Sequence, residues 1–487
     1  MNNPDPLRAV FVTPECAPLV KTGGLGDVSA SLPAALARLG VDMKILLPGY
    51  PSVLTAVPQA RERARIPADG AFPASRILEA AGPAGVPLLI LECPPLYERN
   101  GGPYQDEQGE DWPDNALRFG LLSRVAALVG SHACPLPWRA QVVHCNDWQT
   151  GLAPVYLAFA QPPRAASLFT IHNISYQGIF APELAVELGL PPASFSPEGV
   201  EYYGKLCFLK AALYYADAMT TVSPTHAREI QTEELGFGMH GLLAKRRDSL
   251  SGILNGIDTE LWDPSADPLI ARRYDIHTLP AKIENKRSLQ ASMELARDDK
   301  VPLLGIVSRL APQKGVDLLV QIAATLIGLP AQIAIQGVGE GLLQRELLAL
   351  ARAHPGRIAV RIGFNEPLAH GIEAGADIFL MPSRFEPCGL NQMYSQRYGT
   401  PPVVRATGGL LDSVVDFSPA TLADGTATGF VFDGGAADLL AAIERACSVY
   451  RARTTWRDLQ RNGMSKDFGW NSSAERYLAL YRRIARV

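Results

Sequence analysis

The chain has 487 residues, of which 47% are hydrophobic and 19% are charged, and its formal net charge at pH 7 is −4. This composition is typical of a globular protein with room for two or three domains, and the slight negative charge argues against general binding to nucleic acid or to an anionic membrane. Seven scattered cysteines without a Cys-x-x-Cys pair argue against a disulfide framework or a structural zinc site, and the N-terminus lacks a signal-like segment, so we expect a cytoplasmic protein.

The first half of the chain alternates short apolar stretches, which are typical of buried strands, with helical patterns. Strands are expected at 9–12, 43–47, 87–91, 141–144, 168–171 and 219–222, and helices at 27–39, 116–129 and 202–216. Such alternation predicts a parallel sheet with helices on both faces. The polar, glycine-rich stretch 100–112 has no period and is expected to be a surface loop over a cleft.

The first strand is followed by a glycine-rich stretch, Lys-Thr-Gly-Gly-Leu-Gly-Asp-Val at 21–28, which leads into the first helix. Glycines let the backbone turn tightly and approach a ligand, and a helix start offers N–H groups and the positive end of a dipole to a phosphate. Lys21 adds a positive charge beside Gly23 and Gly24. The alternative is an ordinary turn capped by Asp27, because short glycine patterns recur by chance.

The alternation pauses after 255–258, where a proline-containing stretch without a strong period, 262–280, indicates a domain junction. It resumes with strands expected at 303–307, 332–335, 358–362, 378–381, 402–404 and 429–432. The sequence therefore predicts an α/β protein with two doubly wound, Rossmann-like domains, 1–258 and 259–465, and a final segment, 466–487, that contains an amphipathic helix. Ligands bind beyond the carboxyl ends of such strands, so two facing domains predict a cleft between them.

The loop after the expected strand 303–307 carries two cations, Arg309 and Lys314, followed by a glycine and a helix. Two cations at this spacing suit a doubly charged anion such as a diphosphate. The alternative is a pair of solvated surface charges, which is the usual fate of Arg and Lys.

The loop after the expected strand 378–381 combines a carboxylate, a thiol and a glycine, namely Glu386, Cys388 and Gly389. The backbone N–H groups of Gly389 and Leu390 can face an anion, and Glu386 can accept hydroxyls of a sugar. Alternatively, Glu386 is a solvated charge and Cys388 a small buried residue. Thr407 opens one more glycine loop after the next strand.

Two strand ends in the first half also carry polar groups: Asp147 with Trp148, and His172. Asp147 can hold a sugar hydroxyl while Trp148 packs on the ring. For His172, a histidine held by backbone hydrogen bonds in the sheet is the simpler interpretation. A metal site from Cys145, Asp147 and His172 is disfavoured, because zinc ligands usually lie closer together in sequence.

Together these motifs resemble those of bacterial glycogen synthases and plant starch synthases, which use ADP-glucose to lengthen an α-1,4-glucan. The matching stretches lie in family order over nearly the whole chain: 21–28, 144–152, 172–173 with 176–178, 255–258, 308–315, 383–390 and 407–409. The resemblance implies the two-domain arrangement called GT-B, with the C-terminal helix crossing back to the first domain. It also implies a donor, ADP-glucose, and a glycogen or α-1,4-glucan acceptor. Arg309, Lys314 and Lys21 can neutralise the charge of a departing diphosphate without metal, so we expect no metal or other cofactor.

The resemblance further implies roles for individual residues. The diphosphate would lie against Arg309 and Lys314, with Lys21 nearby and the loop of Gly23 and Gly24 below. The transferred glucose would be surrounded by Glu386, Cys388, Gly389, Asp147, His172 and Asn255, while Leu390 and Asn391 would approach the nucleotide phosphate. Of these, we expect Glu386, His172, Asp147, Arg309 and Lys314 to be catalytic and the others, with Thr407, to bind substrate.

Some residues depart from the family pattern. Asn146 and Gln149 stand where some bacterial relatives carry histidines, Asn391 where many carry threonine, and Phe364 at a place often held by tyrosine near the adenine. UDP-glucose therefore stays open as an alternative donor. A phosphorylase would need pyridoxal phosphate on a lysine, and a nicotinamide enzyme an acidic residue after the second strand, where 46–49 offers none. The sequence leaves the oligomeric state open.

Overall fold

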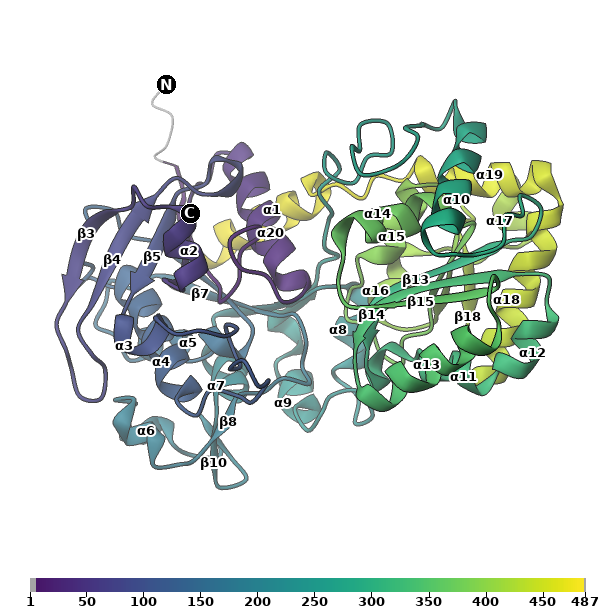
Figure 1. Ribbon diagram of the computed structural model, residues 1–487. Coiled ribbons are helices and arrows are strands. Elements are labelled where there is room, and N and C mark those ends of the chain that lie inside the picture. Colours follow the sequence, from purple (N-terminus) through teal and green to yellow (C-terminus); the bar gives the residue numbers. More distant parts are fainter. Residues whose placement is uncertain (1–5, 486–487) are drawn as a thin grey trace. The chain divides into compact units, whose positions relative to one another are not determined.

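The computed structural model describes residues 6–485, which divide into two compact units (Figure 1). The first unit contains the described residues up to Gly256 and those from Trp470 onward, and the second runs from Ile257 to Gly469. Each unit has its own sheet and its own cluster of buried apolar side chains.

The sheet of the first unit has nine strands in the order β12-β11-β7-β6-β1-β2-β5-β4-β3. The strands from β12 to β5 in this order are parallel, whereas β4 and β3 pair antiparallel at one edge. Because β1 lies beside both β2 and β6, the direction of winding reverses between β1 and β6. The bounds are β1 Arg8–Val12, β2 Asp42–Pro48, β3 Arg61–Ile66, β4 Ser75–Ala80, β5 Leu88–Glu92, β6 Val142–Asn146, β7 Ala166–Ile171, β11 Ala218–Thr221 and β12 Leu250–Gly252.

The helices of the first unit lie between these strands, and a small sheet of β8, β10 and β9 interrupts the alternation. The small sheet consists of β8 Ile179–Phe180, β9 Glu201–Tyr202 and β10 Lys205–Cys207. The helices are α1 Gly24–Arg38, α2 Pro51–Ala56, α3 Pro94–Tyr97, α4 Asn115–Val129, α5 Ala153–Ala158, α6 Leu184–Glu187, α7 Phe208–Tyr215, α8 Pro224–Glu229, α9 His240–Lys245 and α20 Asn471–Ala485.

Two expected helices have different starts in the structure. The helix expected at 202–216 begins only at Phe208, because residues 201–207 form the short strands β9 and β10. The first helix begins at Gly24 rather than at 27, with Gly23 in an extended conformation as its N-cap, so Asp27 does not cap it. The antiparallel strands β3 and β4 are additional elements that the sequence pattern did not predict.

The sheet of the second unit is wholly parallel, with the order β15-β14-β13-β16-β17-β18. Numbered within the unit, this is the 3-2-1-4-5-6 order of dinucleotide-binding sheets, in which ligands bind where the winding reverses. That point lies between β13 and β16. The bounds are β13 Leu303–Leu310, β14 Gln332–Gly339, β15 Ile358–Ile362, β16 Ile378–Met381, β17 Pro402–Arg405 and β18 Phe430–Phe432.

Helices cover both faces of this second sheet (Figure 1). They are α10 Lys282–Ser292, α11 Asp317–Gln321, α12 Ala323–Gly328, α13 Gly341–Ala353, α14 Glu366–Gly375, α15 Asn391–Arg397, α16 Gly408–Ser413, α17 Pro419–Ala423, α18 Ala436–Arg451 and α19 Arg453–Met464. The expected strands of this half all exist, and β13 and β14 extend several residues further than expected.

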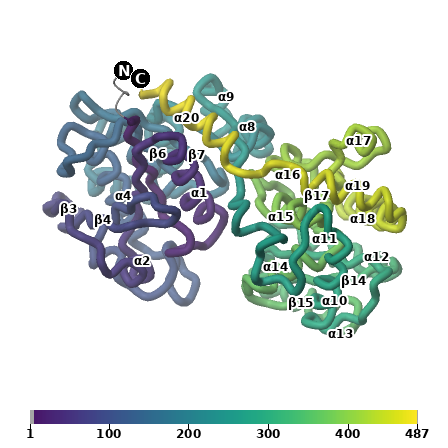
Figure 2. Tube along the Cα trace, turned by 90° about the horizontal axis from the view of Figure 1, so that it is seen from above, coloured from purple at the N-terminus to yellow at the C-terminus, as the bar shows by residue number. Residues whose placement is uncertain are grey.

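The last helix, α20, packs on the first unit beside α1 (Figure 2). Its Tyr477 and Tyr481 are fully buried, and the Tyr481 hydroxyl lies 2.7 Å from Nδ1 of His144 on β6. The other ring nitrogen of His144 lies 2.6 Å from the Thr170 hydroxyl, and burial holds the pKa of His144 well below its usual value. His144 is therefore a neutral core residue that docks the C-terminal helix.

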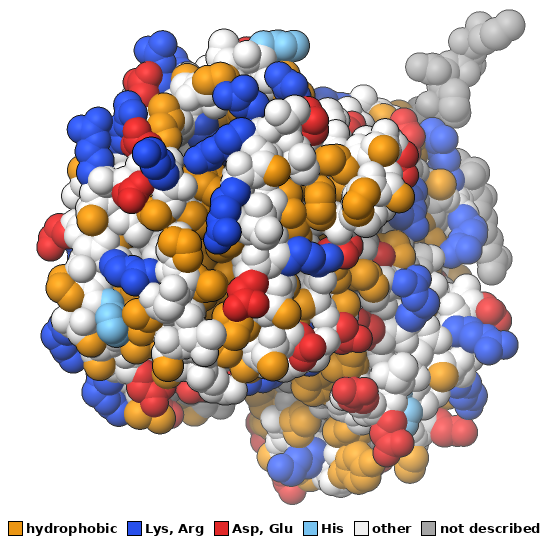
Figure 3. All heavy atoms as spheres, turned by 90° about the vertical axis from the view of Figure 1, so that its right-hand side faces the viewer, with side chains coloured by type: hydrophobic (Ala, Val, Ile, Leu, Met, Phe, Trp, Pro, Cys, Tyr) orange, Lys and Arg blue, Asp and Glu red, His pale blue; other side chains and the backbone are white. Residues whose placement is uncertain are grey.

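On the face displayed in Figure 3, Lys and Arg side chains are interspersed with Asp, Glu and hydrophobic ones. Within residues 6–485, none of the helices combines the length and apolar character needed to cross a bilayer.

Candidate functional site

In the second unit, a buried ion pair lies at the point where the winding reverses. Lys314 is in the loop after β13, Glu386 is in the loop after β16, and Nζ of Lys314 donates to Oε2 of Glu386 over 2.5 Å. The Ser383 hydroxyl donates to the same oxygen over 2.9 Å. Only 7% of the Glu386 side chain and 20% of the Lys314 side chain are exposed. The structure thus brings together two of the predicted residues that are 72 positions apart.

Glycines allow these loops to approach each other closely. Gly315, which follows Lys314, has φ +65°, and a Cβ there would lie 2.0 Å from the carbonyl oxygen of Pro382. Gly408, which follows Thr407, has φ +43°, and its Cβ would lie 2.0 Å from the carbonyl oxygen of Glu386. A side chain at either position would force apart the strand-end loops that carry Lys314 and Glu386.

The other predicted residues of the second unit lie at the same sheet edge. Arg309 is near the end of β13, and its guanidinium lies 3.5 Å from the side-chain oxygen of Gln313. Asn391 is the first residue of α15, and its amide donates to the Val307 carbonyl of β13 over 2.8 Å, which fixes the start of this helix against the neighbouring strand. Cys388 and Thr407 are buried, and Leu390 is the N-cap of α15.

In the first unit, the glycine loop is held by an ion pair and by a buried carboxylate. Nζ of Lys21 is paired with Asp27 at 2.7 Å. Oε2 of Glu15 accepts hydrogen bonds from the backbone N–H groups of Thr22 (2.6 Å) and Gly23 (3.2 Å). Both amides precede Gly24, the first residue of α1, so an internal carboxylate holds the loop that leads into this helix.

Asp147 and His172 lie together at the carboxyl ends of β6 and β7. Oδ1 of Asp147 accepts from the backbone N–H groups of His172 (2.7 Å) and Asn173 (3.3 Å). Removal from water raises the pKa of Asp147 to about 7, although the two amide hydrogen bonds oppose the shift. Nε2 of His172 lies 2.9 Å from the side-chain oxygen of Asn146, and burial lowers the pKa of His172 to about 3. His172 is thus neutral at physiological pH.

Two further features mark predicted residues of the first unit: the backbone of Asp147 and the side-chain oxygen of Asn255. Asp147 has φ +55°, a conformation that non-glycine residues rarely adopt and that is often found at functional sites. Asn255 is 6% exposed, and its buried side-chain oxygen has no hydrogen-bond partner among the described residues. A buried acceptor of this kind is suited to a ligand hydroxyl.

Sequence reasoning missed three residues that the structure adds to these two sites: Glu15, Tyr104 and Ser383. The Tyr104 hydroxyl donates to Oε1 of Glu15 over 2.5 Å, although the two residues are 89 positions apart. The carboxylate of Glu15, a few residues before the glycine loop, was the available signal, because a helix start favours a nearby anion.

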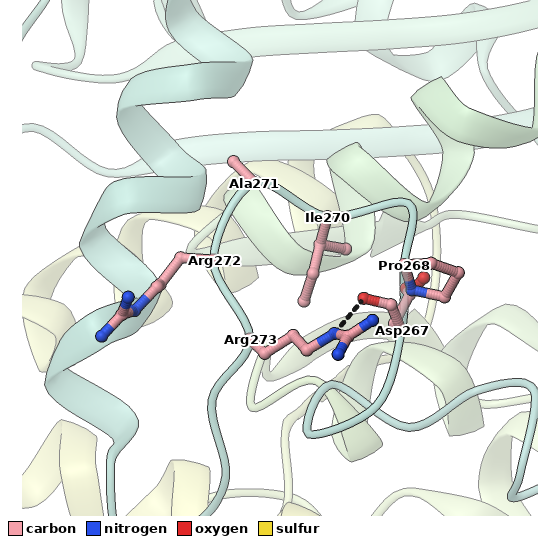
Figure 4. A pocket seen from close by; sticks show the side chains of 6 residues that line it. All are labelled: Asp267, Pro268, Ile270, Ala271, Arg272 and Arg273. Atoms are coloured by element: carbon pink, nitrogen blue, oxygen red, sulfur yellow. Dashed lines mark hydrogen bonds between the residues drawn. The ribbon is translucent and has the colours of Figure 1, made fainter.

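A surface pocket of about 390 Å³ lies elsewhere in the second unit and contains none of the predicted site residues (Figure 4). Its lining side chains all come from the segment 267–273, and Nε of Arg273 donates to the Asp267 carbonyl over 3.2 Å. The carboxylate of Asp267 is engaged by buried His370 (2.7 Å) and Tyr398 (2.6 Å). Through Asp267, the segment that lines this pocket is therefore attached to the rest of the second unit.

No group of three or more His, Cys, Asp or Glu side chains is arranged to hold a metal ion within residues 6–485. All seven cysteines are free thiols. Cys388 is buried at the site, Cys134 is partly exposed, and the other five are buried elsewhere.

Two family models match the chain. The starch synthase catalytic domain matches residues 8–245, and the glycosyl transferases group 1 domain matches residues 290–462. Each match falls within one structural unit, and together they include every predicted site residue except Asn255.

Curated relatives are similar over almost the full length. A glycogen synthase of Nitrosospira multiformis is 56% identical over 98% of this chain and 97% of its own, and one of Aromatoleum aromaticum is 57% identical over 98% and 96%. Among solved structures, the catalytic domain of starch synthase IV from Arabidopsis thaliana bound to ADP and acarbose superposes with a TM-score of 0.86 at 32% identity, covering 99% of this chain and 100% of that one. Sucrose-phosphate synthase from Thermosynechococcus elongatus shares the fold, with a TM-score of 0.59 at 18% identity and 98% coverage of both chains.

Proposed function

The chain belongs to the glycogen synthase family of glycosyltransferases and has the GT-B fold, and we propose that it transfers glucose from ADP-glucose to the non-reducing 4-hydroxyl end of an α-1,4-glucan, with release of ADP. The observation that carries this proposal is the ion pair of Lys314 and Glu386 at the carboxyl edge of the second sheet. It supplies a cation for a diphosphate and a carboxylate for sugar hydroxyls in one site.

On the donor side, we assign Arg309 and Lys314 to the diphosphate. Arg309 is the second-last residue of β13 and Lys314 lies in the loop after it, at the place where dinucleotide-binding sheets hold phosphates. Leu390 and Asn391, at the start of α15, would approach the nucleotide phosphate through their backbone N–H groups. Thr407 would close the donor site from the next loop, as the N-cap of α16.

For the transferred glucose, we assign Glu386, Cys388 and Gly389 in the second unit and Asp147, His172 and Asn255 in the first. Lys21 and the loop of Gly23 and Gly24 would add to the donor site. The neutral state of His172 fits a hydrogen-bonding role toward a sugar hydroxyl better than that of a cation.

The proposed reaction retains the configuration at the anomeric carbon. The acceptor oxygen forms a bond to the anomeric carbon, the bond from that carbon to the diphosphate breaks, and the acceptor proton moves to the departing phosphate oxygen. Arg309 and Lys314 would stabilise the charge that develops on the diphosphate, as preorganised groups do in many transferases. A front-face route is favoured because Glu386 is engaged by Lys314 and Ser383 as a hydrogen-bonding group.

The proposed setting is the cytoplasm, with ADP-glucose and an α-1,4-glucan as partners and without metal or other cofactor. We further propose that residues 1–258 bind the acceptor glucan, that 259–465 bind the nucleotide sugar, and that 466–487 form the helix that returns to the first domain.

The test is to incubate the purified protein with labelled ADP-glucose or UDP-glucose and glycogen. We expect incorporation into glycogen with a higher kcat/KM for ADP-glucose. Equal or reversed values would move the assignment to a retaining glucosyltransferase that uses UDP-glucose, which is the alternative left by Asn391 and Phe364.

A further inference from the structure

Glu15 is a buried carboxylate that joins two loops of the first unit. Its side chain, on a residue that is 3% exposed, accepts hydrogen bonds from the backbone N–H groups of Thr22 and Gly23, from the Thr22 hydroxyl (2.5 Å) and from the Tyr104 hydroxyl (2.5 Å). The first three donors belong to the glycine loop at the start of α1. The fourth belongs to the segment 98–114 between α3 and α4.

The backbone around Glu15 is also fixed by hydrogen bonds. Glu15 donates its N–H to the Thr13 hydroxyl (3.3 Å), and that hydroxyl donates to the Glu15 carbonyl (2.7 Å) and also lies 2.8 Å from the Ser29 hydroxyl on α1. The carbonyl of Gly26 accepts from the N–H of Ala17 (3.0 Å). The glycine loop is therefore closed around the Glu15 carboxylate.

Tyr104 in turn organises the segment 98–114. Its carbonyl accepts from the backbone N–H of Trp112 (3.0 Å) and from the side-chain amide of Asn115 (2.9 Å). Its ring lies 5.9 Å from that of Phe119, which meets the Trp148 ring edge-on at 5.1 Å. Trp148 directly follows Asp147, so a continuous row of contacts runs from Glu15 to the proposed glucose-binding residue.

We infer that Glu15 is a positioning residue, which through Tyr104 holds the glycine loop and the segment 98–114 in one arrangement around Lys21 and Asp147. The carboxylate binds the amides of Thr22 and Gly23, which precede the first helical residue, Gly24, so it fixes the loop that leads into α1. This inference rests on the proposed function only for its kinetic readout.

The test removes one hydroxyl. Tyr104→Phe keeps the ring on Phe119 and loses only the hydrogen bond to Glu15. Tyr156→Phe is the matched control, because the Tyr156 hydroxyl donates to the Leu188 carbonyl over 2.6 Å in the same unit without touching either loop. In hydrogen–deuterium exchange, we expect faster exchange in peptides covering 15–26 and 98–114 together in Tyr104→Phe, and in neither peptide in the control.

The kinetic readout separates positioning from stability. We expect kcat for glucose transfer to fall about tenfold in Tyr104→Phe with the donor KM within about threefold, and to stay within about twofold in Tyr156→Phe, at similar thermal unfolding temperatures. Exchange that rises only in 98–114, or an unchanged kcat, would overturn the inference. Glu15→Gln, which keeps the shape but not the charge, should reproduce both effects. A wild-type protein inactive with both nucleotide sugars would refute the proposed function, while the exchange result still decides the role of Glu15.

Discussion

Replacing Glu386 by glutamine separates the two functions that we assign to the Lys314–Glu386 pair. The carboxylate lies 2.5 Å from Nζ of Lys314 and accepts from the Ser383 hydroxyl. Glutamine has the same shape and can still accept from Ser383, but it does not neutralise Lys314. We therefore expect Glu386→Gln to bind ADP more tightly than the wild type and to transfer glucose more slowly.

The size of both effects follows from the geometry. A phosphate charge bound by Lys314 would lie about 6 Å from the carboxylate, and two unit charges at that separation repel by about 1.4 kcal/mol at an effective dielectric constant of about 40. Since 1.4 kcal/mol is one decade and salt weakens the repulsion, the Kd of ADP should fall about three- to tenfold. Hydrogen bonds from sugar hydroxyls to a carboxylate contribute roughly 1.5–3 kcal/mol each, so kcat should fall at least about tenfold.

Isothermal titration calorimetry gives the Kd of ADP, and incorporation of labelled glucose into glycogen gives kcat. Asp299→Asn is the control, because Asp299 also pairs with a cation, Arg287, but precedes β13 at the opposite edge of the same sheet. It should leave both values within about twofold. An unchanged or weaker affinity for ADP in Glu386→Gln, or a normal kcat, would refute the assignment of the pair.

Three further predictions follow from other contacts. Arg309→Ala and Lys314→Ala should each lower kcat/KM at least about tenfold, while wild-type activity should persist in excess chelator; dependence on added Mg²⁺ in an initial-rate assay would contradict both. The pKa of Asp147, raised to about 7, means that the native state keeps a proton that the unfolded chain releases near pH 4. Stability should therefore fall as pH rises from about 4 to 7, and Asp147→Asn should raise the melting temperature relative to wild type more at pH 8 than at pH 5 in calorimetric scans. Tyr481→Phe leaves buried His144 without its 2.7 Å partner and should lower the free energy of unfolding in urea by about 1–3 kcal/mol.

The fold was predictable where strands are buried on both faces. The expected strand 378–381 coincides with β16, Ile378–Met381. In a chain that alternates strands and helices, a short apolar run bounded by turn residues is typical of a buried strand. Strand β3, Arg61–Ile66, escaped prediction because it is an edge strand whose alternating arginines and glutamate remain solvent-exposed. The start of α7 was misplaced because Tyr202 and Leu206 continue the helical pattern while pairing in a small sheet.

The candidate site was predictable as a set of strand ends but not as a set of contacts. Parallel strands bring their carboxyl ends to one edge, which suffices to group Arg309 and Lys314 with Glu386. That Lys314 pairs with Glu386, rather than remaining solvated, depends on the close approach of Gly315 to Pro382, a distance that no sequence spacing encodes. The anchoring of the segment 98–114 by Tyr104 was unpredictable for the same reason.

The two units stabilise a buried carboxylate at the carboxyl edge of their sheets in different ways. Each sheet places a carboxylate where its winding reverses: Glu15 after β1 and Glu386 after β16. Glu15 accepts hydrogen bonds from two backbone amides and two hydroxyls. Glu386 is neutralised by Lys314, a side chain with three donors that can bind a carboxylate and a phosphate at once. Because Lys314 can share its donors with a phosphate, we expect ADP affinity to reside mainly in the second unit and Lys21 to act chiefly on the transfer step.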